Sequence, residues 1–464
     1  MSANENHRTV NGGAVNHGTV NHRTVNRRVV VTGMGAITPS GLDVDSLWNS
    51  VVTGTSAIGL LEGEQFADLA VRIGGQVKGF DAEAVLPRSL ARRLSPVQHW
   101  AIAAADQALA QAGVAIAAGG DTFPWDRNRI AVIAATGSGP VDAMQSATRA
   151  LLEGGPRSVP LTLAIHGAPD SAAALLSQRY DIRGPGQGVS ATCASGAIGL
   201  GEGLRRIRHG YADAVLVVGM EDCLNPVNLA SNANMRALAA GFEGDPTIAS
   251  RPFDKDRAGF VMSQGAAAIL LESEEAAAAR GATVLAELAG FGAASDAHHP
   301  TNPHPEGRGA ASAVREALAD AGLSATDIHH INAHATGTSA GDAAELHAFD
   351  AALGTAARSI PISATKSSTG HLLGASGIVE AIIAIRTMSA QTLPPTINLG
   401  EPEFDGWDIV AGEARSLART DESEGGADGS VDTVLSTSFG FGGHNGAIVL
   451  RRPGTQTDPH RTLN

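Results

Sequence analysis

Four residues of this sequence have side chains suited to nucleophilic and proton-transfer catalysis: Cys193, His334, Lys366 and His371. A thiol can attack a substrate and form a covalent intermediate, and an imidazole can move protons or stabilise a developing negative charge. Each residue lies in a segment of small residues just past an apolar, strand-like run. Because α/β folds place functional loops at strand ends, the pattern predicts nucleophilic catalysis by Cys193 with the histidines as partners.

The tripeptide Ser-Ala-Thr precedes both the thiol and the cation. Residues 190–192 run into Cys193, and residues 363–365 run into Lys366. Two further echoes fall in the same order, residues 134–138 with 334–338 and residues 212–216 with 431–435. Collinear echoes indicate an internal duplication. We therefore expect two equivalent halves, with Lys366 at the duplicated position of the nucleophile.

Strand-like apolar runs alternate with Ala-rich helical stretches along the chain. The runs are residues 130–134, 214–218, 267–271, 330–333, 434–437 and 447–450. Such alternation is typical of α/β layers whose sheets are buried on both faces. The elements that position the reactive residues are therefore expected to be buried strands that end in short loops.

Cys193 is expected at the start of a helix, because apolar residues recur after it at helical spacing (Ile198, Leu200, Leu204 and Ile207). The positive end of a helix dipole lowers the pKa of a thiol below its usual value of about 8.5. We therefore expect a thiolate near neutral pH. The alternative is a buried structural cysteine, which is the interpretation we give to Cys223.

The composition of the chain excludes several classes of function. The chain has 464 residues, 43% hydrophobic residues, a net charge of −14 and two cysteines. The negative charge argues against nucleic acid or an anionic membrane as the main partner. Two cysteines fit a reducing compartment, and the polar N-terminus lacks the apolar core of a signal peptide. A cytoplasmic protein is expected.

The expected organisation is two halves between two tails. Residues 1–27 and 453–464 are predicted to be disordered tails, and residues 420–430 a surface loop. The first half is expected over residues 28–282, with the nucleophile, and the second over 283–452, with His, Lys and His. Gly33 and Gly35 form a Gly-x-Gly after a strand, but without a convincing third glycine or acidic residue we interpret them as a tight turn rather than a dinucleotide site.

The sequence from about Arg28 to Arg452 resembles the β-ketoacyl-[acyl carrier protein] synthases, the condensing enzymes of fatty-acid and type II polyketide synthesis. Besides the motifs above, residues 251–257 (Arg-Pro-Phe-Asp-Lys-Asp-Arg) and 438–445 (Ser-Phe-Gly-Phe-Gly-Gly-His-Asn) carry the resemblance. It implies a thiolase-like, duplicated five-layer αβαβα fold. It also implies decarboxylative Claisen condensation of an acyl thioester with malonyl carrier protein, without a metal or other cofactor.

The resemblance implies a role for each reactive residue. Cys193 would be the acylated nucleophile, His334 and His371 would drive decarboxylation, and Lys366 would form an ion pair with Glu380. The backbone amides of Cys193 and Phe441 would form the oxyanion hole. Further implied residues are Gly440 and Gly442 in a mobile turn gated by Phe441, Thr336 and Thr338 as phosphopantetheine contacts, and Pro140 in the acyl pocket.

The resemblance also implies partners. The substrates would arrive on an acidic acyl carrier protein, which requires local basic patches on this acidic chain. Candidate patches are Arg88, Arg92 and Arg93, and the cluster Arg205, Arg206 and Arg208, although either group could be an ordinary solvated helix face. A homodimer is expected, and a heterodimer with a related chain is the alternative.

The sequence has three other interpretations: a degradative thiolase, a catalytically silent subunit and a zinc site. A degradative thiolase would need a second cysteine in the C-terminal half, and none follows Cys223. A catalytically silent chain-length-factor-like subunit would lack the nucleophile, which is present here. A zinc site could be formed by four residues of one proline-interrupted stretch, Asp296, His298, His299 and His304.

Several positions depart from the family pattern. The family usually has Asp at 258, Gly and an acid at 263 and 264, Gly at 335 and Pro at 339. This chain has Ala258, Ser263, Gln264, Ala335 and Ser339. These changes lie near the turn expected to gate the site, and they raise the hypothesis of a specialised rather than a housekeeping synthase.

Overall fold

The computed structural model describes residues 26–115, 123–417 and 429–455. Most of the two predicted tails and of the predicted loop at 420–430 therefore lies outside the described residues. The described part centres on one sheet of ten strands, in the order β10-β9-β13-β14-β8-β1-β7-β6-β4-β5. The strands are β1 (Val29–Ile37), β4 (Ile130–Ala135), β5 (Gly186–Val189), β6 (Ala214–Glu221), β7 (Gly265–Ser273), β8 (Ala286–Ser295), β9 (His330–Asn332), β10 (Ile362–Ser363), β13 (Thr433–Gly440) and β14 (His444–Arg451).

The order of the strands repeats about the middle of the sheet. Five strands precede the expected division at residues 282 and 283, and five follow it. The halves meet where β1 pairs with β8 through only two residue pairs, Val30 with Glu287 and Val31 with Ala286. All six strands expected from the sequence form, as β4, β6, β7, β9, β13 and β14.

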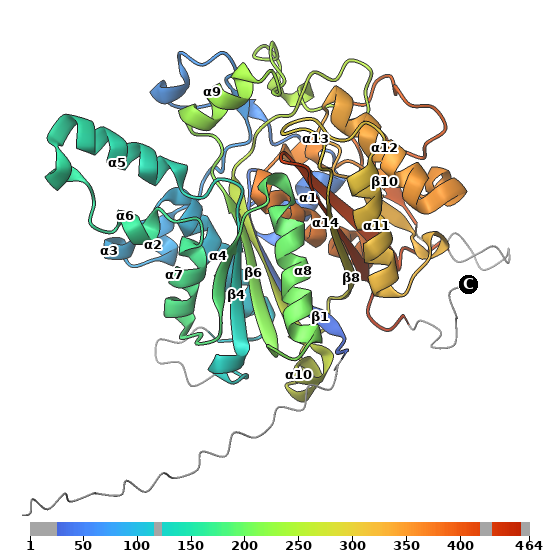
Figure 1. Ribbon diagram of the computed structural model, residues 1–464, viewed down its shortest axis with the longest axis horizontal. Coiled ribbons are helices and arrows are strands. Elements are labelled where there is room, and N and C mark those ends of the chain that lie inside the picture. Colours follow the sequence, from blue (N-terminus) through green and yellow to red (C-terminus); the bar gives the residue numbers. More distant parts are fainter. Residues whose placement is uncertain (1–25, 116–122, 418–428, 456–464) are drawn as a thin grey trace, which may run out of the picture.

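Helices cover both faces of each half-sheet. The first half carries α4 (Pro96–Gln111) and α7 (Ser171–Tyr180) on its outer face, and the second carries α11 (Arg308–Ala321) and α12 (Ser339–Leu353). Between the half-sheets lie α8 (Ser195–Arg208) and α14 (Ser376–Ala390) (Figure 1). This arrangement confirms the predicted thiolase-like αβαβα fold.

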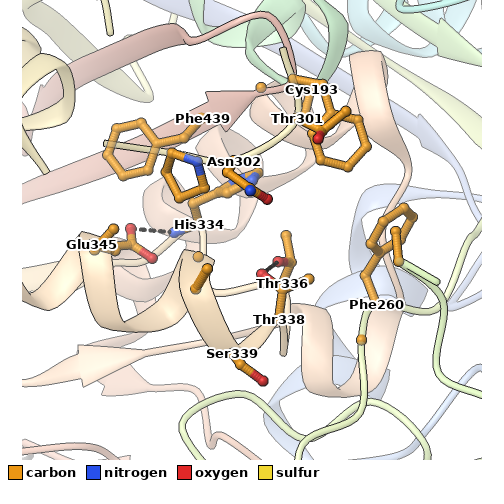
Figure 2. Close-up of a pocket in the computed structure, with 18 of the residues that line it drawn as sticks. Cys193, Phe260, Thr301, Asn302, His334, Thr336, Thr338, Ser339, Glu345 and Phe439 are labelled. Carbon is orange, nitrogen blue, oxygen red and sulfur yellow. Dashed lines mark hydrogen bonds between the residues drawn. The ribbon is translucent and has the colours of Figure 1, made fainter. Parts of the chain in front are cut away.

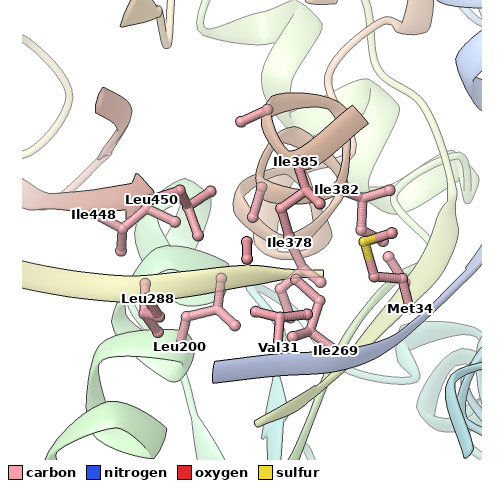
Figure 3. Packing of buried hydrophobic residues seen from close by; sticks show 14 of the residues in the cluster. Val31, Met34, Leu200, Ile269, Leu288, Ile378, Ile382, Ile385, Ile448 and Leu450 are labelled. Carbon is pink, nitrogen blue, oxygen red and sulfur yellow. The ribbon is translucent and has the colours of Figure 1, made fainter. Parts of the chain in front are cut away.

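The period-two alternation of the strands explains the layers. In β4, Ala131, Ile133 and Ala135 point into the central cluster, whereas the residues between them point into the outer cluster with α4. Strands buried on both faces must be apolar throughout, as their sequences are. Figure 3 shows the central cluster, where Ile378 and Ile382 of α14 pack beside Leu200 of α8 and the strands.

The two central helices approach each other backbone to backbone near their N-termini. A Cβ atom on Gly196 would lie 2.9 Å from the nitrogen of Ile378, and one on Gly377 would lie 2.5 Å from the nitrogen of Ala197. Only glycine allows this contact. Residues Leu373–Ala390, apolar enough by composition to cross a membrane, are 78% buried inside the protein and form its central core.

The structure corrects the expected match between Cys193 and Lys366. Ala194-Ser195-Gly196 contains the N-cap residue and first two residues of α8, and the same tripeptide at residues 375–377 does so for α14. The residues two places before each tripeptide, Thr192 and Leu373, both have positive φ, +50° and +43°. The equivalent of Cys193 is therefore Gly374. Lys366 lies in a short helix, α13 (Lys366–Thr369), between β10 and the turn that leads into α14.

The remaining elements are short or peripheral. They are α1 (Val44–Val52), β2 (Gly59–Leu60), β3 (Ile73–Gly74), α2 (Ala82–Val85), α3 (Arg88–Ala91), α5 (Val141–Gly154), α6 (Leu163–His166), α9 (Pro226–Asn234), α10 (Glu274–Ala279), β11 (Thr392–Leu393) and β12 (Arg415–Ser416). Helices α5 and α6 project from one side of the layers (Figure 1).

Candidate active site

The nucleophile lies in the elbow between β5 and α8. Cys193 is the middle residue of a 3₁₀ turn, Thr192–Ala194, that leads directly into α8, and its side chain is buried. The hydroxyl of Ser195 accepts a hydrogen bond from the nitrogen of Ala191 at 2.8 Å and fixes the turn. The predicted position at a helix N-terminus is thus confirmed.

The structure does not support the predicted thiolate form of Cys193. Burial raises the pKa of the Cys193 thiol to about 12. The charge of Lys366 lowers that pKa in part, the carboxylate of Glu221 raises it, and the N–H groups of Phe441 and of Cys193 itself lower it. Loss of water around the sulfur outweighs the favourable charges and dipoles, because a thiolate without solvent is costly. Cys193 is therefore a neutral thiol in the free protein at pH 7.

The two predicted histidines face each other across the cavity that Cys193 also lines. Their ring centroids are 5.3 Å apart and the planes are nearly perpendicular, at 82°. Burial lowers the pKa of both rings well below the ordinary value, and Lys366 lowers both further. Both imidazoles are therefore neutral at physiological pH, and each keeps one N–H to donate.

Each histidine is held by a different contact. Nδ1 of His371 lies 3.0 Å from the hydroxyl of Ser376, and its Nε2 is buried without a hydrogen-bond partner among the described residues. When Ser376 donates to Nδ1, the ring proton is on Nε2, the nitrogen free to meet a substrate. His334 is fixed through its backbone, whose N–H donates to Glu345 at 2.8 Å (Figure 2).

Lys366 and Glu380 form the predicted ion pair, and both side chains are buried. Burial raises the pKa of Glu380 to about 7, and the adjacent Lys366 lowers it in part. Lys366 acts on both histidines and on Cys193 through its charge. The pair thus sets the electrostatic environment of the site without touching the cavity, whose lining does not include it.

The predicted glycine-rich turn closes over the thiol. Phe441 follows Gly440 at the end of β13, and its backbone N–H faces the sulfur of Cys193, as does the N–H of Cys193 itself. A side chain at Gly440 would collide with the hydroxyl of Thr192. Gly442 has φ +84°, in the region that favours glycine. Two backbone donors therefore lie beside the sulfur, next to where the oxygen of an acyl group on Cys193 would develop negative charge.

A cavity of about 270 Å³ leads from the surface to this group. Cys193, His334, His371, Thr336 and Thr338 all line it. The hydroxyls of the two threonines are 3.2 Å apart, and both residues lie on the wall of the cavity (Figure 2). This part of the wall therefore offers two hydroxyl groups to a polar ligand in the cavity.

Two buried acids that the sequence analysis missed hold the His334 loop. Glu345 accepts from the nitrogens of His334 and Ala335, and Asp342 accepts from the nitrogens of Gly337 and Phe253. Both lie on α12, three residues apart and so on one face. Acids at this spacing just after a His-Ala-Thr-Gly-Thr loop were the available signal.

Arg257, also missed, supports the same loop from outside. Its guanidinium donates to the carbonyl oxygens of Thr338 and Ser339 at 3.3 and 2.9 Å, and it pairs with Glu403. The carbonyl of Ser339 is one of its acceptors, so the departure at that position leaves this anchor in place. Arg257 therefore fixes the threonine wall of the cavity.

Other predicted residues lie away from the cavity. Pro140 is buried at the start of α5 and does not line it. Arg88, Arg92 and Arg93 at α3 also lie outside its lining. Arg205 and Arg206 are in the last turn of α8, about 15–17 Å along the helix from Ser195 at its N-terminal end. They bond Glu202 and Gln187, as Arg208 bonds Asp320. The structure does not bring these arginines to the mouth.

A different arginine does lie at the mouth. Arg236 and Met235, in the loop after α9, line the cavity and are exposed. Among the described residues, no carboxylate forms an ion pair with Arg236. The sequence analysis missed it because no second basic residue marks it as a patch.

The departures from the family pattern are accommodated locally. Gln264, oriented with its amide nitrogen toward Asp222, donates to that carboxylate and accepts from the nitrogen of Val77, both at 3.1 Å. An acid at this position would face Asp222 directly. Ser263 donates to the carbonyl of Thr369 at 2.7 Å, and Ala335 has a strained φ of +23°. Ala258 lines the cavity without a polar group.

The histidine-rich stretch takes another role than metal binding in this structure. Asp296 accepts from the amide of Asn445 and from the nitrogen of His304, both at 3.0 Å. Across residues 26–115, 123–417 and 429–455, no three His, Cys, Asp or Glu side chains are grouped to hold a metal ion. Asp296 instead links the loop of residues 296–304, which we call the entrance loop, to Asn445 at the base of the glycine-rich turn.

Comparisons with known proteins agree with this geometry. The N-terminal domain of β-ketoacyl synthases matches residues 26–277, and the C-terminal domain matches residues 285–400. A "3-oxoacyl-[acyl-carrier-protein] synthase 2" of Synechocystis is 39% identical over 91% of this chain and 98% of its own, and one of Vibrio cholerae is 39% identical over 91% and 99%.

Solved structures give the same result. A type II polyketide ketosynthase, solved in complex with its acyl carrier protein, superposes with a TM-score of 0.81 at 29% identity, over 92% of this chain and 100% of that chain. A β-ketoacyl synthase from Burkholderia phymatum superposes with a TM-score of 0.80 at 33% identity, over 92% and 99%.

Proposed function

Because this chain belongs to the β-ketoacyl synthase family, it is a condensing acyltransferase, and we propose that Cys193, His334 and His371 divide its reaction between them. The observation that carries the assignment is that all three line one cavity, with two neutral imidazoles beside a buried thiol. The reaction is the synthesis of a 3-oxoacyl thioester from an acyl group and malonyl-[acyl carrier protein], as in fatty-acid biosynthesis.

In the first half-reaction, the sulfur of Cys193 attacks the carbonyl of an acyl thioester on the carrier. The bond to the carrier's phosphopantetheine sulfur breaks, and that sulfur leaves with the proton that Cys193 loses. The N–H groups of Cys193 and Phe441 stabilise the negative oxygen of the tetrahedral intermediate. Since the resting thiol is protonated, it must lose its proton before or during the attack.

In the second half-reaction, malonyl carrier protein enters the same cavity and loses carbon dioxide. The electron pair of the broken carbon–carbon bond moves to the thioester oxygen, forming an enolate. N–H groups of neutral His334 and His371 would donate to that oxygen, a role that depressed pKa values favour because a neutral ring remains a donor across the physiological range.

The enolate carbon then attacks the acyl group on Cys193. The new carbon–carbon bond forms, the thioester bond to Cys193 breaks, and the thiolate takes up a proton. The products are 3-oxoacyl carrier protein, carbon dioxide and the free thiol. No step requires a metal or a redox group, so we propose that the substrates' own phosphopantetheine is the only prosthetic group involved.

We propose an acyl carrier protein as the partner, docked at the mouth beside Arg236. The position of Arg236 supports this, because an exposed cation that pairs with no carboxylate in the described part of the chain suits an acidic or phosphorylated surface. Arg236→Glu should raise the KM for carrier substrates about tenfold and leave kcat nearly unchanged. Arg88→Glu is the matched control, and an equal effect of both changes would contradict docking at Arg236.

We propose a homodimer through the β5 edge of the sheet, in the cytoplasm. β5 ends the strand order and is partly exposed, and the segment that contains α5 and α6 exposes large apolar side chains. These are Met144, Leu151 and Leu152 of α5, Leu161 just before α6, and Ile165 of α6. An unpaired edge with such a surface favours association. A mass of one chain by light scattering would contradict the proposal, and co-purification with a related chain would support the heterodimer.

The test of the proposed reaction is intact-protein mass spectrometry. The wild type should gain the mass of an acyl group after incubation with acyl carriers of different lengths, and lose it when malonyl carrier is added and 3-oxoacyl carrier appears. The preferred carrier identifies the primer and decides between housekeeping and specialised synthesis. Failure of every donor to acylate the protein would favour the silent-subunit alternative.

A further inference from the structure

The residue before the nucleophile reaches the turn that closes over it. Thr192 lies in the elbow with φ +50°, a conformation that is rare and strained for a β-branched residue. Its hydroxyl lies 2.9 Å from the carbonyl oxygen of Phe441 and 2.8 Å from that of Ala191. One hydroxyl proton can serve only one of these two acceptors at a time.

The peptide unit between Phe441 and Gly442 is held at both ends. Its carbonyl accepts from Thr192, and its N–H donates to the carbonyl of Pro300 in the entrance loop at 2.6 Å. On the other side of the same residue, the N–H of Phe441 faces the sulfur of Cys193. The orientation of the Phe441 donor therefore depends on how this peptide is fixed.

The glycines of the turn give the peptide between Phe441 and Gly442 conformational freedom. Gly440, Gly442 and Gly443 flank Phe441, and the last two have φ +84° and +75°. The last of these glycines is anchored, because the carbonyl of Gly443 accepts hydrogen bonds from the backbone N–H of Asp296 and the side-chain amide of Asn445 at the base of the turn. These glycines would allow the residues around Phe441 to move between the anchored base and the elbow.

We propose that Thr192 is a positioning residue that latches the Gly440–Gly443 turn closed over Cys193 through the carbonyl of Phe441. Its hydroxyl releases the turn by donating to Ala191 instead, so this half-buried hydroxyl keeps a partner in either state. In the closed state the latch aims the N–H of Phe441 at the reacting acyl group. The role of that donor in catalysis rests on the proposed function, whereas the latch itself does not.

Hydrogen exchange of the turn tests the latch without reference to activity. Thr192→Val keeps the size and branching of the side chain and removes only the hydroxyl. Its loss should speed exchange of the Phe441 and Gly442 amides about threefold to tenfold, as expected for one hydrogen bond. Thr192→Ser should restore slow exchange. Ser190→Ala, which removes a neighbouring hydroxyl that does not reach the turn, should leave it unchanged.

Condensation kinetics on the same variants test the aiming role. Thr192→Val should lower kcat about tenfold with little change in the KM for malonyl carrier, and Thr192→Ser should recover most of it. Unchanged exchange in a folded Thr192→Val would overturn the latch, and Thr192→Ala replaces it if the valine variant does not fold. Faster exchange with normal kcat would overturn the aiming role. A wild type without condensing activity would overturn the proposed function, while the exchange result would still decide the latch.

Discussion

Helices α8 and α14 begin at two elbows of the same shape, and only one of them carries a reactive side chain. Each elbow has a residue of positive φ, a 3₁₀ turn and the tripeptide Ala-Ser-Gly. In the first elbow, the side chain of Cys193 faces the cavity. In the second, Gly374 takes its place, and its N–H donates to the carboxylate of Glu221 at 3.0 Å.

The two elbows differ in what fills them. The N–H of an elbow at a helix N-terminus suits a negative oxygen. Around Cys193 that position is left for the substrate, whereas around Gly374 the buried carboxylate of Glu221 already occupies it and also accepts from Gly137 and Ser138. The duplicated fold thus provides two anion-binding positions, of which one is open to substrate and the other is filled from within.

The largest expected effect removes the side chain that distinguishes the elbows. Cys193→Ala should abolish acylation and lower condensation by about a thousandfold or more, because Cys193 is the only thiol among the described residues that line the cavity. Cys223→Ala should retain activity, since that thiol is buried among apolar residues away from the cavity. Intact-mass analysis after incubation with acyl carrier measures both. Acyl transfer to Cys193→Ala would contradict the assignment.

The second expected effect concerns the protonation state of the Cys193 thiol in the first elbow. In a Cys223→Ala background, the rate of alkylation of Cys193 by iodoacetamide should rise about tenfold per pH unit from pH 7 to 10, because the thiolate is the reactive form and burial raises the thiol pKa to about 12. A plateau below pH 8 would show instead that the helix N-terminus and Lys366 outweigh burial.

A third change tests whether the closed elbow has room for any side chain. Gly374→Ala should lower the free energy of unfolding by about 1–3 kcal/mol, because the added Cβ would collide with the backbone of Gly137 and the carboxylate of Glu221. Gly244→Ala is the matched control, since nothing lies within 4 Å of a Cβ there. Denaturant unfolding compares the two, and equal stabilities would show that the second elbow is not filled as described.

The smallest effect concerns the carboxylate that fills the second elbow. Burial raises the pKa of Glu221 to about 7, so its contribution to stability is largest at low pH and declines as pH rises through about 7. Glu221→Gln removes this titration. The variant should therefore be least stable relative to the wild type near pH 5.5, and the difference should shrink by pH 8. Unfolding midpoints at both pH values test this, and a difference that grows with pH would contradict it.

The sequence predicts most of the fold because strands buried on both faces leave continuous apolar runs, and all six expected strands form. The sequence also predicts that Cys193, His334 and His371 act together, since each follows a strand end, and in the structure all three line one cavity. The equivalence of Cys193 with Gly374 was missed because the Ser-Ala-Thr repeat is more conspicuous than the Ala-Ser-Gly repeat that begins both helices.

Other features could not be read from the sequence for physical reasons. The direction of the Cys193 pKa shift depends on how much water the folded chain removes from the sulfur. The arginines at 205 and 206 form a basic cluster in sequence, yet the length of α8 carries them to the end opposite the site. Thr192 gives no signal at all, because its contact with Phe441 joins residues 249 positions apart.

The central claim is that the two half-reactions belong to different residues of one cavity. Release of carbon dioxide from malonyl carrier protein by Cys193→Ala and His334→Ala, measured beside acylation by mass, tests it most directly. We expect Cys193→Ala to release carbon dioxide without forming 3-oxoacyl product, and His334→Ala to accept the acyl group yet release carbon dioxide at least a hundredfold more slowly than Cys193→Ala. Equal rates of release in the two variants would contradict the assignment.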